Sequence, residues 1–180
     1  DKVRHIDETG REALRVNQGG VIVPVAALQD KAERPFFQRS SSLSAGELYV
    51  SAFDLNMDSG VIEEPHKPTL RFAVPVFNSA GQSRGILIIN YLGGRLIERL
   101  QSLTAPFSGR FRLLNAGGYW IRAADRQYEW GFLLPGRQDA SLARSDPLLW
   151  DLIRTTPTGQ ARHHGGLFTW QRITARDWVP

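Results

Sequence analysis

The sequence predicts an α+β fold made of two modules, each an antiparallel sheet flanked by helices. Between residues 70 and 76, apolar side chains alternate with other residues, which is the period of a strand with one buried face. Turn residues at 78–81 lead into the apolar run 85–89, which is short enough for a buried strand. The order of hairpin, helix and strands recurs about one hundred residues further on, which predicts the second module.

The first module is expected to span residues 1–100. Its predicted elements are, in order, a hairpin over 1–25, a helix over 26–33, three long strands within 46–93 and a helix over 95–103. The first helix is expected to end before Pro35, because proline lacks an amide donor and restricts the residue before it. A new turn is therefore expected from Arg34.

The second module is expected to span residues 101–180 and to be incomplete at its end. Its predicted elements are strands over 111–115 and 119–122 around a glycine turn, a helix over 147–155, and strands over 159–164 and 167–173. Pro147 is typical of the first turn of a helix, and Asp146 before it is a good capping residue.

The composition indicates a globular domain, with 42% hydrophobic and 22% charged residues. The arginines behind the net charge of +4 are scattered, which favours a solvated surface over a nucleic-acid partner. The absence of cysteine excludes disulfides, thiolate metal sites and cysteine nucleophiles, and fits an extracytoplasmic bacterial domain.

Neither a membrane-spanning segment nor a signal peptide is recognisable in the sequence. The chain begins inside a strand-like pattern at residues 2–6, so we expect it to be a piece of a longer protein. Any contact with a membrane would then be made by segments outside this chain.

The signals for metal binding and catalysis are weak, so no cofactor, metal site or catalytic residue is predicted. Residues 54–60 resemble the start of a calcium loop, but Pro65 stands where a bidentate glutamate is needed. His163 and His164 are adjacent, and neighbours on a strand point to opposite faces. A serine-hydrolase motif is missing. A glycosidase would need two facing carboxylates, for which Asp54 and Glu63 are the one plausible pair.

Several strings, in this order and spacing, resemble the double Cache fold. They are VRHIDETGREALRVN, LQDKAERPFFQ, GELYVSAFDLN, VIEEPHKPTLRFAVPVFN, GILIINYL, GGYWIRAAD, EWGFLLP and GLFTW. This fold is a tandem of PAS-like domains found as the periplasmic or other extracytoplasmic sensor of bacterial histidine kinases, diguanylate cyclases and chemoreceptors. The resemblance implies a receptor in the inner membrane, and a homodimer formed through a long N-terminal helix that this chain lacks.

The resemblance also implies a small-molecule pocket in the membrane-distal module, over residues 1–95. The positions that match the family's amino-acid-binding residues are Arg34, Phe36, Phe37, Tyr49, Asp54 and Asn90. Asn90 stands where that family has an acid, and an amide pairs with a ligand ammonium only weakly. A small carboxylate held by Arg34, with Arg71 as a second candidate, is therefore the predicted ligand.

Two other functions fit the same sequence. The sheets could serve as a dimerisation or spacer module of a membrane receptor that binds no ligand. The chain could also be a secreted carbohydrate-active enzyme. Residues 34–37 could likewise be a helix end with two core aromatic residues and a surface arginine.

Overall fold

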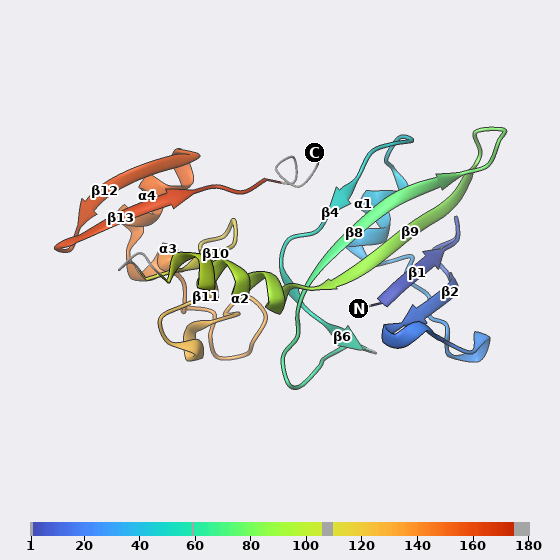
Figure 1. Ribbon diagram of the computed structural model, residues 1–180, viewed down its shortest axis with the longest axis horizontal. Coiled ribbons are helices and arrows are strands. Elements are labelled where there is room, and N and C mark those ends of the chain that lie inside the picture. Colours follow the sequence, from blue (N-terminus) through green and yellow to red (C-terminus); the bar gives the residue numbers. More distant parts are fainter. Residues whose placement is uncertain (1, 59, 106–109, 175–180) are drawn as a thin grey trace. The chain divides into compact units, whose positions relative to one another are not determined.

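The computed structural model describes residues 2–58, 60–105 and 110–174 (Figure 1). The chain divides into two compact units, Asp1–Leu96 and Ile97–Pro180. The module boundaries expected at 1–100 and 101–180 lie close to this division and stay a prediction. Among the described helices, none is both long and apolar enough to cross a membrane.

The first unit is built on a seven-stranded antiparallel sheet with strand order β3-β2-β1-β9-β8-β4, in which β5 also pairs with β8 (Figure 1). Its strands are β1 (Lys2–Ile6), β2 (Glu12–Asn17), β3 (Val21–Ile22), β4 (Tyr49–Val50), β5 (Asp54–Leu55), β8 (Pro68–Phe77) and β9 (Ser83–Leu92). The remaining elements are the ribbon of β6 (Met57–Asp58) and β7 (Val61–Ile62), the short turns η1 (Gln18–Gly20) and η2 (Val25–Ala27), and the helices α1 (Pro35–Ser41) and α2 (Gly93–Thr104).

The core of this unit lies between α1 and one face of the sheet. It consists of Ile6, Phe36, Phe37, Ala73, Ile86 and Ile88. The opposite face of the sheet is apolar but exposed, with relative exposures of 37–45% at Val3, Leu14, Leu87, Ile89 and Tyr91. The predicted hairpin and the strands predicted around 70–76 and 85–89 are confirmed, the latter with longer bounds. In β8, however, Arg71 and Ala73 lie on the side of the strand that faces α1. Phe72 and Val74 lie on the opposite side.

The prediction of a helix over 26–33 that ends before Pro35 is wrong. The helix of this region, α1, begins at Pro35. Proline is tolerated in the first turn, where its missing N–H has no intrahelical partner and its fixed φ is already helical. Helical backbone from Pro35 onward also places Phe36 and Phe37 in the core. Tertiary packing of these two rings therefore decides where the helix lies.

The third long strand predicted before β8 is also wrong, since the segment is broken into β4 and β5. Both pieces pair with β8, and Ser51 lies between them beside Arg71. The backbone N–H of Ser51 donates to the Arg71 carbonyl at 2.9 Å, and the Ser51 Oγ accepts from the Arg71 N–H at 2.9 Å. A side-chain hydroxyl thus replaces a backbone carbonyl, which interrupts the ladder at that position.

The second unit, which takes up α2 from Ile97 onward, is made of short elements. They are β10 (Leu113–Leu114), β11 (Trp120–Arg122), η3 (Arg126–Tyr128), α3 (Leu142–Ser145), α4 (Pro147–Thr155), β12 (Thr158–His163) and β13 (Gly166–Gln171). The predicted helix over 147–155 is confirmed with its cap, because Asp146 Oδ1 accepts from the Leu149 N–H at 3.1 Å. The strands predicted in this unit are confirmed, with shorter bounds at β10 and β11.

The prediction that His163 and His164 point to opposite faces is wrong. Strand β12 ends at His163, and His164 has a left-handed φ of 44°, which turns its ring toward its neighbour. The ring centroids are 4.2 Å apart, and their Nε2 atoms lie 2.7 Å and 3.5 Å from Asp146 Oδ2. The cluster of Asp146, His163 and His164 joins the β12–β13 hairpin to the start of α4. Because the two rings lie on the same side, strand geometry does not exclude a metal at this cluster.

Replacing Ile88 by alanine should lower the free energy of unfolding by about 2–5 kcal/mol, because the side chain is fully buried under α1. The matched control is Ile89→Ala, which changes the next residue of β9 on the exposed face and should cost about 1 kcal/mol or less. Urea denaturation measures both values. Equal losses would contradict the assignment of the core to the α1 side of the sheet.

Asp146→Asn should preserve the cap of α4, because asparagine caps as well as aspartate, but should remove the charge that faces the two histidines. Burial alone would raise the pKa of Asp146, but hydrogen bonds from the Leu149 N–H and His163 and the charges of both histidines lower it overall. The stability that this carboxylate contributes is therefore present above its ordinary pKa and lost as the pH falls through the lowered value. In urea titrations the wild type should be more stable than the variant at neutral pH, and the difference should disappear as the pH falls below about 4. A difference independent of pH would contradict this role.

Candidate functional site

The inner face of the first unit's sheet is apolar at one end and polar at the other. Arg4 shares a face of β1 with the core residue Ile6, and Asn90 shares a face of β9 with Ile88, because alternate residues of a strand point the same way. Arg71 of β8 is paired in register with Asn90. The rings of α1 cover the apolar end, so the polar end is left to line a cavity.

This cavity has a volume of about 50 Å³, which is room for about four water molecules. It is lined by Arg4, Lys31, Arg34, Phe36, Asn56, Met57, Gly60, Arg71 and Asn90. Four of these nine residues are cationic, and none of the nine carries a carboxylate. The lining therefore favours an anion.

Arg4 is the most firmly held of the four cations. Its guanidinium is buried, with Nε 2.9 Å from Glu12 Oε1 and Nη1 donating to Asn90 Oδ1 at 3.1 Å. Glu12 in turn accepts hydrogen bonds at 3.1 Å from Arg15 and from the Gln29 N–H. These contacts orient the Asn90 amide, whose nitrogen lies 3.5 Å from Asn56 Oδ1.

Arg71 is fixed from two sides. Its Nη1 lies 3.1 Å from Asp54 Oδ2, and its guanidinium carbon lies 5.7 Å from the centroid of the Phe36 ring. Only 5% of the residue is exposed. Phe36 therefore contributes both to the core and to the wall of the cavity.

Lys31 and Arg34 are the cations with the fewest partners. The Lys31 Nζ donates to Gln29 Oε1, and burial together with the charges of Arg4, Arg34 and Arg15 lowers the pKa of the ammonium despite the opposing effect of Glu12. The Arg34 side chain makes no hydrogen bond or ion pair with any residue that the structure describes. These two groups are the ones a ligand could pair with first.

The structure brings together four of the residues proposed from the sequence, namely Arg34, Phe36, Arg71 and Asn90. Asp54 lies next to them as the partner of Arg71. Phe37 belongs to the core, and Tyr49 packs against that core instead of lining the cavity. The two aromatic residues of this segment thus lie in the core, and the role of residues 34–37 in ligand binding stays a prediction.

Sequence reasoning missed Arg4, Lys31 and Asn56. The signal for Arg4 was present, because a charged residue two positions before the apolar Ile6 shares its face in a strand. Lys31 and Asn56 gave no signal, since loop and ribbon residues reach the cavity only through tertiary folding.

Asp54 and Glu63, the candidate glycosidase pair, are each bound to cations. Glu63 lies 2.9 Å from the Lys67 ammonium and 3.7 Å from that of Lys2, and hydrogen bonds from Lys67 and Asn56 lower its pKa. A glycosidase acid needs a raised pKa instead. The geometry therefore does not favour this chemistry.

Comparisons with solved structures find the same fold in bacterial sensors. A domain assigned to the sensory box/GGDEF family of Vibrio parahaemolyticus is 23% identical, with a TM-score of 0.78 over 96% of this chain and 66% of that chain. The extracellular domain assigned to the histidine kinase vpHK1S-Z8 is 23% identical, with a TM-score of 0.74 over 94% of this chain and 61% of that chain. The ligand-binding domain of the Pseudomonas aeruginosa PAO1 amino acid chemoreceptor PctC, in complex with GABA, is 17% identical, with a TM-score of 0.57 over 94% and 65%.

The chain thus spans two thirds or less of the length of each of these chains. A search of curated proteins finds no match. The predicted α+β fold and the likeness to Cache-type sensors are confirmed by these neighbours, and the expected extracytoplasmic location agrees with them. The family described as the sensor domain of bacterial histidine kinases matches residues 1–177. The chain belongs to the bacterial histidine kinase sensor-domain family.

Proposed function

We propose that the first unit binds a small carboxylate-bearing metabolite in the cavity between α1 and the polar end of its sheet. The observation that carries this proposal is the lining, which contains four cations and no carboxylate. An anion would relieve the repulsion among these like charges. This chain would then be the ligand-sensing part of a transmembrane receptor.

The four cations would take different parts in binding. Arg34 can present its planar fork to a carboxylate, because its side chain is not engaged elsewhere in the described residues, and Lys31 can add a second charge. Arg4 and Arg71 are held by Glu12 and Asp54, so they would contribute a fixed positive field and some hydrogen bonds. A preorganised field of this kind costs little reorganisation on binding.

A ligand with an ammonium group would find no carboxylate partner among the lining residues. Asn90 occupies the position where the resemblance leads us to expect an acid, and its Oδ1 already accepts from Arg4. GABA, which the Pseudomonas neighbour holds, carries an ammonium as well as a carboxylate. We therefore place the ligand among small carboxylates without an amine.

Signalling requires that the ligand bind one conformation more tightly than another. Arg34 is the residue before the first turn of α1, so pairing with a ligand would draw the start of that helix toward the sheet. The output would be a cytoplasmic histidine kinase, or alternatively a diguanylate cyclase, outside this chain. The homodimer implied by the resemblance remains a proposal, which the exposed apolar face of the sheet supports.

A screen of small mono- and dicarboxylates by thermal shift tests this function. A ligand at one hundred times its Kd should raise the stability of the unit by about 2.7 kcal/mol, which is a shift of several degrees. Arg34→Ala should weaken binding about tenfold or more, because it removes the free guanidinium. Arg39→Ala is the matched control, an exposed arginine of α1 outside the cavity lining, and should leave binding unchanged.

Failure of every carboxylate to stabilise the protein would favour the spacer function instead. Stabilisation that Arg34→Ala and Arg39→Ala reduce equally would place the ligand elsewhere. Turnover of a glycoside that depends on Asp54 or Glu63 would support the enzyme alternative.

Asn90→Asp tests the choice of ligand class. The new carboxylate should pair with Arg4 and reduce the positive charge of the cavity, so the affinity for simple carboxylates should fall about tenfold. Ligands that also carry an ammonium, with GABA as the probe, should gain affinity relative to them. Isothermal titration calorimetry measures both, and an unchanged ratio between the two ligand classes would contradict the role of Asn90.

A further inference from the structure

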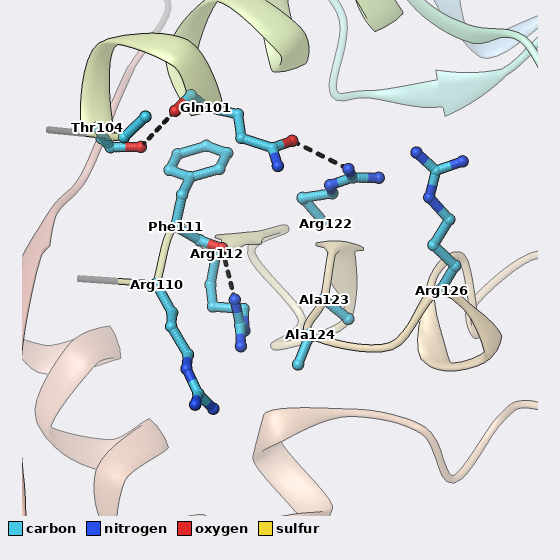
Figure 2. A pocket seen from close by; sticks show the side chains of 10 residues that line it. Gln101, Thr104, Arg110, Phe111, Arg112, Arg122, Ala123, Ala124 and Arg126 are labelled. Atoms are coloured by element: carbon cyan, nitrogen blue, oxygen red, sulfur yellow. Dashed lines mark hydrogen bonds between the residues drawn. The ribbon is translucent and has the colours of Figure 1, made fainter. Parts of the chain in front are cut away.

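The second unit contains a larger cavity, independent of the one in the first unit. It has a volume of about 330 Å³, within the range of small-molecule sites. Figure 2 shows the side chains around it, which come from the end of α2, the segment entering β10, strand β11 and the turn η3. The lining residues are Gln101, Thr104, Ala105, Arg110, Phe111, Arg112, Arg122, Ala123, Ala124 and Arg126.

Four of these residues are arginines, and none of the lining residues is acidic. In Figure 2 the arginines surround the Ala123–Ala124 segment. Arg112 and Arg122 are half-buried, whereas Arg110 and Arg126 are exposed at the edge. The cavity is thus open to solvent and strongly positive.

Only one of the four guanidiniums has a carboxylate partner among the described residues. Arg122 lies 3.4 Å from Glu129 Oε1 and donates to Gln101 Oε1 at 2.9 Å, which holds it in place. Within the described parts of the chain, the Arg112 side chain donates only to the Phe111 carbonyl, at 2.8 Å. Burial and the charges of Arg110 and Arg122 lower the pKa of Arg112, which indicates an unfavourable concentration of positive charge.

We propose that this arginine cavity binds an organic phosphate, a small anion with more than one negative charge. Guanidinium forks bind phosphate oxygens bidentately, and a dianion can neutralise two of the arginines that lack an acidic partner. The volume exceeds what a phosphate group alone would fill. The Phe111 ring, Ala123 and Ala124 supply apolar surface for the organic part of the ligand.

Isothermal titration calorimetry of the 180-residue chain with glycerol 3-phosphate tests the proposal, with glycerol as the uncharged control. Glycerol 3-phosphate should bind and glycerol should not. Arg112→Gln and Arg126→Gln should each weaken binding about tenfold. Arg162→Gln makes the same change of charge on exposed β12 outside the cavity, and should change the affinity by less than about twofold.

The same phosphate monoester chemistry is offered by a soluble metabolite and by a lipid headgroup. Co-sedimentation with vesicles of phosphatidic acid, against phosphatidylcholine alone, distinguishes the sources. Binding in solution without sedimentation assigns the cavity to a soluble phosphate, and sedimentation lost in Arg112→Gln and Arg126→Gln assigns it to a lipid. The proposal is overturned if neither probe binds, or if Arg162→Gln weakens binding as much as the two cavity variants. Because Arg126 is exposed, its variant should keep its fold, and circular dichroism checks this.

Discussion

The buried ion pair between Arg4 and Glu12 organises the first unit. It joins β1 to β2, and through Asn90 and Gln29 it reaches β9 and the loop before α1. A buried charge left without its partner costs about 3–5 kcal/mol, so neither member can be lost without disturbing the others. The pair thus makes it possible for an arginine to stand in the sheet at the edge of an apolar core, which gives the cavity its positive wall.

The length of α1 sets the second constraint. The helix spans Pro35–Ser41; both of its phenylalanines pack in the core at the apolar end of the sheet, and Phe36 also contacts Arg71 at the start of the polar end. The short helix leaves a space of about 50 Å³ beside Phe36, and Arg34 stands at its edge. Phe36 therefore belongs both to the hydrophobic core and to the lining of the cavity.

Both units concentrate arginine side chains around a cavity with no acid in its lining. Such groupings oppose folding, because like charges repel and burial removes their hydration. They are typical of sites that complete their electrostatics with a bound anion. The net charge of +4 does not reveal these two groups of cations, because acidic residues elsewhere on the chain balance most of the positive charge.

The sequence by itself determined the elements whose signals are local. These are the hairpin, the long strands β8 and β9, and helix α4 with its Asp146 cap, because alternation, turn residues and capping act within a few residues of chain. Arg34 and Asn90 were proposed from the resemblance to Cache-type sensors, with Arg71 added as a second cation, and all three line the cavity. Tertiary structure alone decided where α1 begins, how His164 turns toward Asp146, and that Lys31 and Asn56 line the cavity. Those outcomes depend on contacts between distant segments, such as the packing of Phe36 and Phe37 on the sheet, and short stretches of sequence do not contain that information.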